Sequence, residues 1–490
     1  MSFDMHIPDH WRWATIADVQ SSEKRSTITG PFGSSIGKKF FVEHGVPVIR
    51  GNNLSLGSTK FKDEGFVFVS EDKAEELRGY KALKHDLIFT AAGTIGQVGI
   101  IPENTEYEYY IISNKQMRVR FDTDKVDPLF AYYWFSSPWM VDYIKRHDTG
   151  STIPLINLGV LRSLPMPLPP VVEQVAIRQY LFMIDEKINN NSKINQTLEQ
   201  MAQALFKSWF VDFEPVKAKI AVLEAGGSQE DATLAAMTAI SGKDADALAA
   251  FEHEHPEQYA ELKATAELFP SAMRESEVGE IPGEWALSEI GAQIDIAGGA
   301  TPSTKTPEFW DKGDIHWTTP KDLSNVKDKI LLDTERKITQ AGLGKISSGL
   351  LPVNTVLMSS RAPVGYLAIA KIPVAINQGY IAMKCNKELS PEFVLQWCSA
   401  NMPEIVSRAS GTTFAEISKK NFNPIPLVKP PVELVKIYTT QVSAIYSVIE
   451  NTMREINSLT QLRDTLLPKL LSGEITLPEA EQAVSEAENV

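Results

Sequence analysis

The sequence feature that most constrains the fold is a long helical pattern that occurs twice in the chain. Apolar residues between Glu173 and Phe210 recur 261 residues later, at intervals of three and four residues or sums of them. Such spacing forms the seam of a helix that packs lengthwise against another helix. Two such helices predict an intramolecular coiled coil. The paired seam positions are Ile184, Ile188, Leu198, Leu205 and Trp209 in the first copy and Ile445, Ile449, Leu459, Leu466 and Leu470 in the second.

A pair of prolines precedes each helical pattern, Pro169-Pro170 in the first copy and Pro430-Pro431 in the second. Proline fixes φ and biases the preceding residue toward extended backbone, so each helix is expected to begin just after its pair. Pro468 and Gly473 predict that the second helix kinks or ends there. A helix from Glu173 to Phe210 would be roughly 57 Å long, which is typical of a spacer.

The repeat extends beyond the helices. Ile7-Pro8 is answered by Ile281-Pro282, and the apolar runs 87–90 and 356–359 each read as a buried strand. The offset between the copies shrinks from 274 to 261 residues, which indicates shorter loops in the second. Each copy mixes short β-branched or aromatic runs with a late helical segment around Trp134 or Trp397. We therefore expect two tandem α+β domains, each followed by a long helix.

The expected organisation has six parts. They are a first domain at 1–168, a central long helix at 169–211, an acidic, alanine-rich connector at 212–280, a second domain at 281–429, a distal long helix at 430–473 and an acidic tail at 474–490.

The net charge of −14 is unevenly distributed. The connector 212–280 contains 15 acidic and 5 basic residues, and the tail adds five more acidic residues, so the two repeated units are close to neutral. A nucleic-acid surface is therefore not excluded, because the local patch matters more than the total charge. The role of the connector is open; one hypothesis is that it mimics the charge of DNA or docks a partner.

Composition and cysteine usage favour a cytoplasmic protein. The chain has no apolar run long enough to span a bilayer and no secretory signal at its start. Its two cysteines, Cys385 and Cys398, belong to no metal-spaced cluster, so we expect a reducing compartment and no bound metal.

No catalytic motif is complete. Gly93, Gly96 and Gly99 could cradle a phosphate, but Ala362 and Ala368 replace two of them in the second copy, which favours a turn between strands. Other fragments lack essential partners, so we expect no catalysis by this chain alone; they are Gly37-Lys38-Lys39, Asn423-Pro424-Ile425-Pro426, Glu71-Asp72-Lys73, and His253 with His255.

The chain resembles the specificity subunit of type I restriction-modification enzymes. The resemblance rests on the tandem arrangement, the Ile-Pro-x-x-Trp openings, the proline pairs, and three runs: 299–303 (GATPS), 205–213 (LFKSWFVDF) and 466–473 (LLPKLLSG). It implies two target recognition domains separated by two helices packed antiparallel, and no catalytic activity of the chain's own. It also implies partners: double-stranded DNA, two methyltransferase subunits, and a restriction and translocation subunit. S-adenosylmethionine, ATP and Mg²⁺ would be held by those subunits.

Such a protein would read a bipartite target, with one half-sequence for each domain and a gap set by the helices. Paired donors and acceptors read bases, whereas lysine and hydroxyl groups hold phosphates. The candidates lie in polar loops of the repeat: Lys38, Lys39, Arg50, Asn52, Asn53, Ser151 and Thr152 in the first unit, and Thr318, Thr319, Lys321, Ser360, Arg361, Thr412 and Thr413 in the second.

Two alternatives stay open. Asn191 and Asn195 occupy seam positions, where a buried Asn could fix the register or a polar stretch could face water. The runner-up function is a two-headed scaffold that binds protein instead of DNA. The salt dependence of binding distinguishes the two, because phosphate-driven binding weakens steeply with salt.

Overall fold

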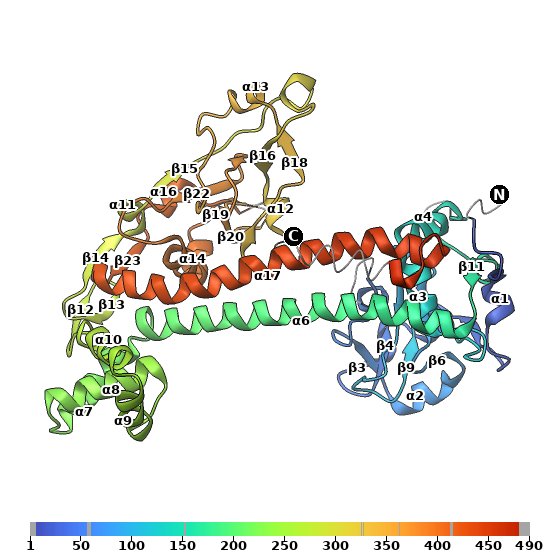
Figure 1. The fold of residues 1–490 in the computed structure, drawn as a ribbon, viewed down its shortest axis with the longest axis horizontal. Helices are drawn as coiled ribbons and strands as arrows, with labels where there is room; N and C mark the ends of the chain where they lie inside the picture. The colour runs from blue at the N-terminus through green and yellow to red at the C-terminus, as the bar shows by residue number, and fades with distance from the viewer. Residues whose placement is uncertain are drawn as a thin grey trace. The chain divides into compact units, whose positions relative to one another are not determined.

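The computed structural model describes residues 6–55, 60–150, 153–324, 326, 328–361, 363–411 and 415–479. The chain forms two compact units, residues 1–190 with 456–490, and residues 191–455. Each unit contains one repeated domain and part of both long helices (Figure 1).

The first unit contains two main sheets and one strand pair. The four-stranded sheet has the order β2 (Thr27–Thr29), β10 (Gln116–Val119), β7 (Leu87–Thr90) and β8 (Val98–Ile100), with antiparallel neighbours. The five-stranded sheet has the order β3 (Phe41–Val42), β5 (Val67–Val69), β4 (Val46–Ile49), β9 (Tyr110–Ile112) and β6 (Lys81–Ala82), in which β4 and β9 are parallel. β1 (Arg12–Thr15) pairs with β11 (Pro165–Leu168).

Five α-helices accompany these strands among the described residues: α1 (Ile16–Val19), α2 (Glu71–Glu76), α3 (Pro128–Ser136), α4 (Pro138–Arg146) and α5 (Leu158–Arg162). Short 3-10 turns η1 (Gly33–Ser35), η2 (Lys38–Phe40), η3 (Gly51–Asn53) and η4 (Arg78–Tyr80) lie in the loops.

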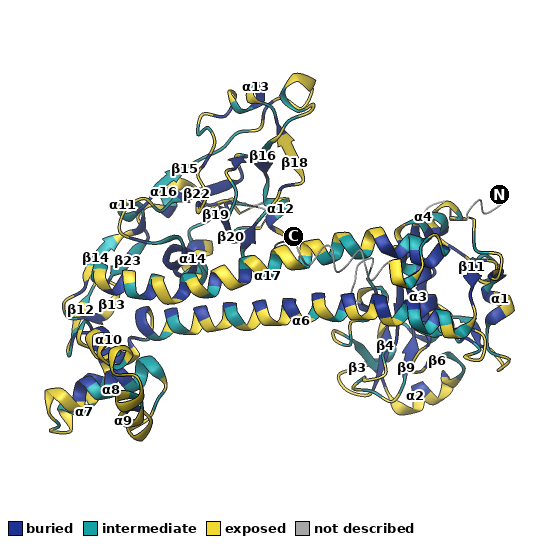
Figure 2. Ribbon diagram, in the orientation of Figure 1, coloured by how far each residue is buried: buried dark blue, intermediate teal, exposed yellow. Residues whose placement is uncertain are grey.

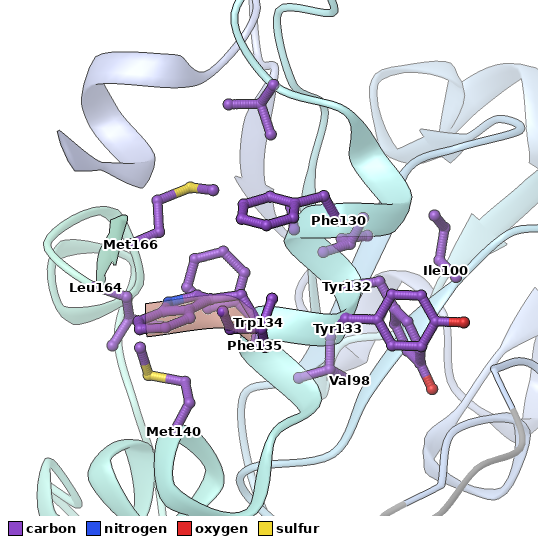
Figure 3. Close-up of a cluster of buried hydrophobic side chains, with 14 of the residues drawn as sticks. Val98, Ile100, Phe130, Tyr132, Tyr133, Trp134, Phe135, Met140, Leu164 and Met166 are labelled. Carbon is purple, nitrogen blue, oxygen red and sulfur yellow. The ribbon is translucent and has the colours of Figure 1, made fainter. Parts of the chain in front are cut away.

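Helix α3 forms the centre of the first unit's core. It begins where the Asp127 carboxylate accepts hydrogen bonds from the backbone N–H groups of Leu129 and Phe130, with proline at its first position. Its aromatic side chains are buried against β8 and β11 (Figure 3). The Trp134 indole N–H donates to the Pro165 carbonyl at 2.8 Å, so the large ring is buried without an unsatisfied donor.

The second unit has a related topology with different numbers of strands in its two sheets. Its larger sheet has the order β15 (Asp295–Ala297), β22 (Tyr380–Lys384), β19 (Val356–Ser359), β20 (Leu367–Ala370) and β17 (Ile330–Leu331). A three-stranded sheet contains β18 (Arg336–Ile338), β16 (Ile315–Thr318) and β21 (Ala375–Ile376), and β16 and β21 are parallel, as β4 and β9 are in the first unit. β14 (Ala286–Glu289) pairs with β23 (Pro426–Lys429), and β12 (Met273–Ser276) with β13 (Gly279–Pro282). The accompanying helices are α11 (Ile290–Gln293), α12 (Pro320–Ser324), α13 (Gln340–Leu343), α14 (Pro391–Ala400), α15 (Met402–Ser407) and α16 (Lys419–Phe422), with the 3-10 turn η5 (Pro307–Phe309).

The two long helices are α6 (Val171–Phe210) and α17 (Val432–Ser472), and each begins just after its proline pair. In the first unit Arg463 Nη1 lies 3.2 Å from Asp185 Oδ1, and in the second the Tyr446 hydroxyl donates to Glu199 Oε2 at 2.7 Å. The N-terminal part of α6 thus contacts the C-terminal part of α17, and the C-terminal part of α6 contacts the N-terminal part of α17. This confirms the antiparallel pairing. Helix α17 continues through Pro468 and ends where Gly473 adopts a left-handed φ of 71°.

Every predicted seam residue is buried or half-buried, and the inward faces of both helices are the buried ones (Figure 2). Asn191 and Asn195 are also buried, with exposed fractions of 5% and 0%. The alternative of a polar stretch that faces water was therefore wrong. The Asn191 amide donates to Glu455 Oε2 at 2.8 Å, and the Asn195 amide to Asp328 Oδ2 at 3.3 Å.

The connector forms a helical insert in the second unit. Its helices are α7 (Glu214–Glu224), α8 (Gln229–Ser241), α9 (Ala245–Glu254) and α10 (Pro256–Glu267), and α8, α9 and α10 share a small apolar core around Met237 and Leu248. All ten acidic residues of these four helices are exposed. Among the described residues of the whole chain, no helix is long and apolar enough to cross a membrane.

Candidate nucleic-acid interface

The first unit contains a cleft of 980 Å³ where the ends of several strands and loops meet. Its walls come from η2, the segment after β4 that includes η3, the turn between β7 and β8, and the connection from β9 to β10. The lining residues are Ile36, Gly37, Lys38, Phe41, Arg50, Gly51, Asn52, Val67, Thr90, Ala92, Gly93, Thr94, Gln97, Ser113, Asn114, Lys115 and Gln116.

The lining contains three cationic side chains and no carboxylate. Lys38 and Lys115 are exposed, and Arg50 is exposed at the end of β4. The salt bridges found within the described residues involve none of these three. Their charges are therefore available to an anionic ligand, although the chain as a whole has a net charge of −14.

Of the seven residues predicted in this unit, Lys38, Arg50 and Asn52 line the cleft. The Asn52 amide donates to the Gly65 carbonyl at 3.1 Å, and its side-chain oxygen accepts no hydrogen bond from the described residues. Lys39 is exposed but lies outside the lining, with its ammonium 4.8 Å from the centre of the Phe40 ring. Ser151 and Thr152 lie outside the described residues.

The prediction of Asn53 as a DNA contact is corrected by its burial. The side chain is 0% exposed, and its oxygen accepts a hydrogen bond from the Arg50 backbone N–H at 2.9 Å. Its amide nitrogen donates to the carbonyls of Lys62 and Glu64 at 3.1 and 2.9 Å. Asn53 therefore shapes the loop that presents Arg50 and Asn52.

The glycine pattern of residues 93–99 forms a turn between β7 and β8. Gly96 has a φ of 91°, and a Cβ atom there would lie 2.9 Å from Val141 Cγ1. Gly99 lies within β8, where a Cβ atom would come within 2.6 Å of Leu54 Cδ2. Gly93, with a φ of 99°, also adopts the turn geometry, so turn geometry and close packing account for all three glycines; Gly93 in addition lines the cleft.

Four polar residues of the cleft were absent from the predicted contacts: Gln97, Asn114, Lys115 and Gln116. The sequence does carry a signal for two of them, because Asn114 and Gln116 are answered in the second repeat by Asn377 and Gln378. A polar pair after a short strand in both copies indicates that the pair lies in the same loop of each domain. The sequence does not show that this loop lies beside Arg50, because that depends on the parallel pairing of β4 with β9.

In the second unit, two of the predicted residues are buried instead of exposed. Thr318 is 0% exposed, and its hydroxyl lies 2.9 Å from the Tyr380 hydroxyl. Ser360 is 3% exposed, and its hydroxyl has no hydrogen-bond partner among the described residues. Thr318 is therefore part of the packed framework, which corrects the prediction for this residue, whereas Ser360 stays a prediction.

The other described candidates of the second unit are engaged with acidic partners. Thr319 donates through its backbone N–H and its hydroxyl to Asp322 Oδ2, at 2.7 and 3.0 Å. Lys321 pairs with Glu335 at 2.7 Å, which raises the pKa of the lysine, and Arg361 lies 3.8 Å from Glu416. Thr412 and Thr413 lie outside the described residues.

The described residues hold no group of three or more His, Cys, Asp or Glu side chains placed to bind a metal ion.

Known proteins resemble this chain over most of its length. A family model described as "Type I restriction modification DNA specificity domain" matches residues 9–200 and 282–461. The chain is 34% identical over 384 residues to the type I restriction enzyme HindI specificity subunit of Haemophilus influenzae, covering 76% of this chain and 83% of that one. It is 22% identical over 478 residues to the putative type I restriction enzyme MjaX specificity subunit of Methanocaldococcus jannaschii, covering 96% and 94%. A crystal structure of a type I restriction-modification system S subunit from M. genitalium aligns over 96% of this chain and 98% of that chain, with 16% identity and a TM-score of 0.49.

Proposed function

Since the chain belongs to the family of type I restriction-modification DNA specificity domains, we propose that it is the subunit that selects the DNA sequence for such an enzyme. Each repeated domain reads one half of an asymmetric bipartite target. The two long helices set the gap between the halves and dock two methyltransferase subunits. The chain itself carries no catalysis and works in the cytoplasm, and its partners supply S-adenosylmethionine, ATP and Mg²⁺ chemistry together with the restriction and translocation subunit.

The observation that carries this proposal is the cleft of the first unit. Its lining combines Lys38, Arg50 and Lys115 with several amide side chains, and it contains no carboxylate. This composition suits DNA, because lysines hold phosphates and Arg, Asn and Gln present paired groups to base edges in the major groove.

The two domains carry different side chains at the loop that is proposed to contact bases. Arg50 and Asn52 of the first unit correspond to Thr319 and Lys321 of the second, each 269 residues later. The same framework positions them, because the Asn53 side chain accepts from the Arg50 N–H and the Asp322 side chain accepts from the Thr319 N–H. One scaffold with different side chains at the loop fits two different half-sequences.

The experiment that tests this function is single-molecule sequencing of adenine methylation in cells that express the chain with its methyltransferase partner. We expect a bipartite motif, one half of which changes when residues 1–168 are exchanged for those of a relative. A methylation pattern that ignores the chain, while the chain still binds its partner, would favour the protein-binding scaffold instead.

The helical insert is proposed to act through its exposed acidic side chains. Its exposed carboxylates suit either mimicry of the charge of DNA or the docking of a basic partner surface. Deletion of residues 226–266 tests both ideas, and unchanged assembly and DNA binding in the deleted chain would remove them.

A further inference from the structure

Gln116 is a buried amide with an unused donor. The side chain is 1% exposed, and its Oε1 accepts a short hydrogen bond from the Ser113 hydroxyl. Its Nε2 has no hydrogen-bond partner among the described residues. A buried N–H group without a partner costs stability, and such groups are uncommon in folded proteins.

This donor lies at the wall of the cleft, beneath Gly51. Gln116 belongs to the lining, and a Cβ atom on Gly51 would lie 3.9 Å from Gln116 Nε2 and 3.6 Å from Gln97 Oε1. A methyl group at position 51 would therefore lie in van der Waals contact with the Gln116 amide. Gln97 differs from Gln116, because its oxygen accepts from the Thr90 hydroxyl at 3.1 Å and its nitrogen donates to the Leu54 carbonyl at 3.3 Å.

The second repeat provides an internal comparison. Gln116 begins β10 and pairs with Thr90 at the end of β7, and Tyr380 begins β22 and pairs with Ser359 at the end of β19. At the equivalent place the Tyr380 hydroxyl lies 2.9 Å from the Thr318 hydroxyl. The polar group at this position is thus satisfied within the protein in the second unit and left unsatisfied in the first.

Resting on the proposed function, we propose that Gln116 is a specificity-determining residue, whose Nε2 donates a hydrogen bond to an acceptor on one base of the half-site read by the first domain. The acceptors available in the major groove are purine N7, guanine O6 and thymine O4. A base without an acceptor at this place would leave the buried donor unpaired. The cost of the unpaired donor would then lower the affinity for that base, in addition to the loss of the hydrogen bond itself.

Three variants of the full chain test the proposal in complex with its methyltransferase partner. Gln116→Met removes the donor at similar size. Gly51→Ala leaves Gln116 unchanged and places a methyl group against its amide. Gln116→Glu keeps the contact with Ser113 but replaces the donor by an acceptor.

The readouts are the methylated motif in cellular DNA and competition binding with duplexes that carry each of the four bases at each position of the half-site. We expect wild type to discriminate at one position by roughly 10- to 100-fold. In Gln116→Met and Gly51→Ala that discrimination falls below about threefold, whereas the other half-site and the gap are unchanged. In Gln116→Glu the preference moves to a base that presents a donor, adenine or cytosine.

Gln174→Met is the matched control. Gln174 is also a fully buried glutamine of the first unit, but it accepts from the Asp127 N–H at 2.9 Å and donates to the carbonyls of Lys125 and Pro169 at 3.0 and 2.9 Å. Its loss should reduce the amount of folded complex without any change in motif, which separates a structural defect from a change in specificity.

An unchanged motif in both Gln116→Met and Gly51→Ala would overturn the inference, and if Gln116→Met fails to fold, Gly51→Ala decides. Retention of the original base by Gln116→Glu would overturn the assignment of a donor. A failure of the proposed function would give a different result. In that case the exchange of residues 1–168 would leave both half-sites of the methylated motif unchanged.

Discussion

Lys60 Nζ lies 2.8 Å from Asp185 Oδ2, so an ion pair ties the segment that follows η3 to the long helix α6. Both side chains are largely buried, with exposed fractions of 15% and 3%. The same carboxylate accepts from the Tyr133 hydroxyl at 2.7 Å and lies 3.2 Å from Arg463 Nη1. One acidic side chain thus joins α3, α6, α17 and the segment next to the cleft.

The second unit has the same lysine with a different acid. Lys329 stands 269 residues after Lys60, and its Nζ lies 2.8 Å from Glu199 Oε1, also on α6. The position on α17 that corresponds to Asp185 lies 261 residues later and is occupied by Tyr446, which is not acidic. The Tyr446 hydroxyl instead donates to Glu199. In both units, therefore, the lysine forms its ion pair with an acidic residue of α6. The repeat alone would predict a partner on α17 in the second unit, because α17 is the copy of α6.

We predict that Lys60→Met destabilises the first unit by about 1–3 kcal/mol, because the buried Asp185 loses one of its partners and keeps Arg463 and Tyr133. The measurement is hydrogen exchange of α3 and β7 in the full chain, since a chain of two units need not unfold in one step. Lys115→Met, which removes an exposed lysine, serves as the control. Equal protection in the two variants would contradict the prediction.

Lys115 and Arg50 should affect DNA binding in different ways. Lys115→Ala is expected to weaken binding to all sequences alike and to reduce the slope of log K against log salt by about 1, because the residue is assigned to phosphate. Arg50→Ala is expected to cost about 1–3 kcal/mol and to relax specificity at one position, because the residue is assigned to a base edge.

Titration of the complex onto cognate and mismatched duplexes at several salt concentrations separates these two effects. Lys39→Ala is the matched control, because Lys39 is exposed nearby but lies outside the cleft lining. A loss of base preference in Lys115→Ala, or none in Arg50→Ala, would reverse the assignments.

Asn53→Ala should act on DNA binding through the loop. It removes one acceptor and two donors that hold the loop between Arg50 and Glu64, and leaves buried backbone groups unpaired. We expect a loss of about 1–3 kcal/mol in the stability of this region. DNA binding should fall, and high DNA concentration should restore it with the same motif. Hydrogen exchange of residues 60–69 and the methylated motif provide the two measurements, and an altered motif would show that Asn53 contacts a base.

The long helices could be predicted from the sequence because their signals are local and repeated. Periodicity marks the buried face, and the proline pairs fix the starts at Val171 and Val432. The partner of Asn195 could not be predicted in this way, because Asp328, which accepts from its amide, is 133 residues away in the sequence.

The site was harder to predict because a polar loop residue can either face a ligand or stabilise its own loop, and the sequence does not distinguish the two roles. Asn52 and Asn53 are neighbours with the same side chain, yet one lines the cleft and the other is 0% exposed. The difference depends on the carbonyls of Lys62 and Glu64, which only the folded loop brings to Asn53. Gln116 was overlooked for the related reason that its unused donor is defined by packing and not by sequence.

We predict that His316 on β16 makes the stability of the second unit depend on pH. Burial lowers the pKa of this imidazole, the nearby Lys337 lowers it further, and Asp333 opposes both. The unfolded chain, with an ordinary pKa of about 6.5, therefore binds more protons than the folded one near that pH. The contribution to stability is present above about pH 6.5 and is lost as the pH falls through the lowered pKa of the folded state.

We therefore expect hydrogen exchange of β16 and β18 to accelerate between about pH 7 and pH 5.5, after correction for intrinsic rates, and the change to be smaller in His316→Gln. Asp333→Asn should increase the effect, because it removes the group that raises the pKa of His316. The first unit, measured in the same samples on β7 and β10, provides the internal reference. If wild type and His316→Gln have the same pH dependence, carboxylates and not His316 govern the stability of this sheet.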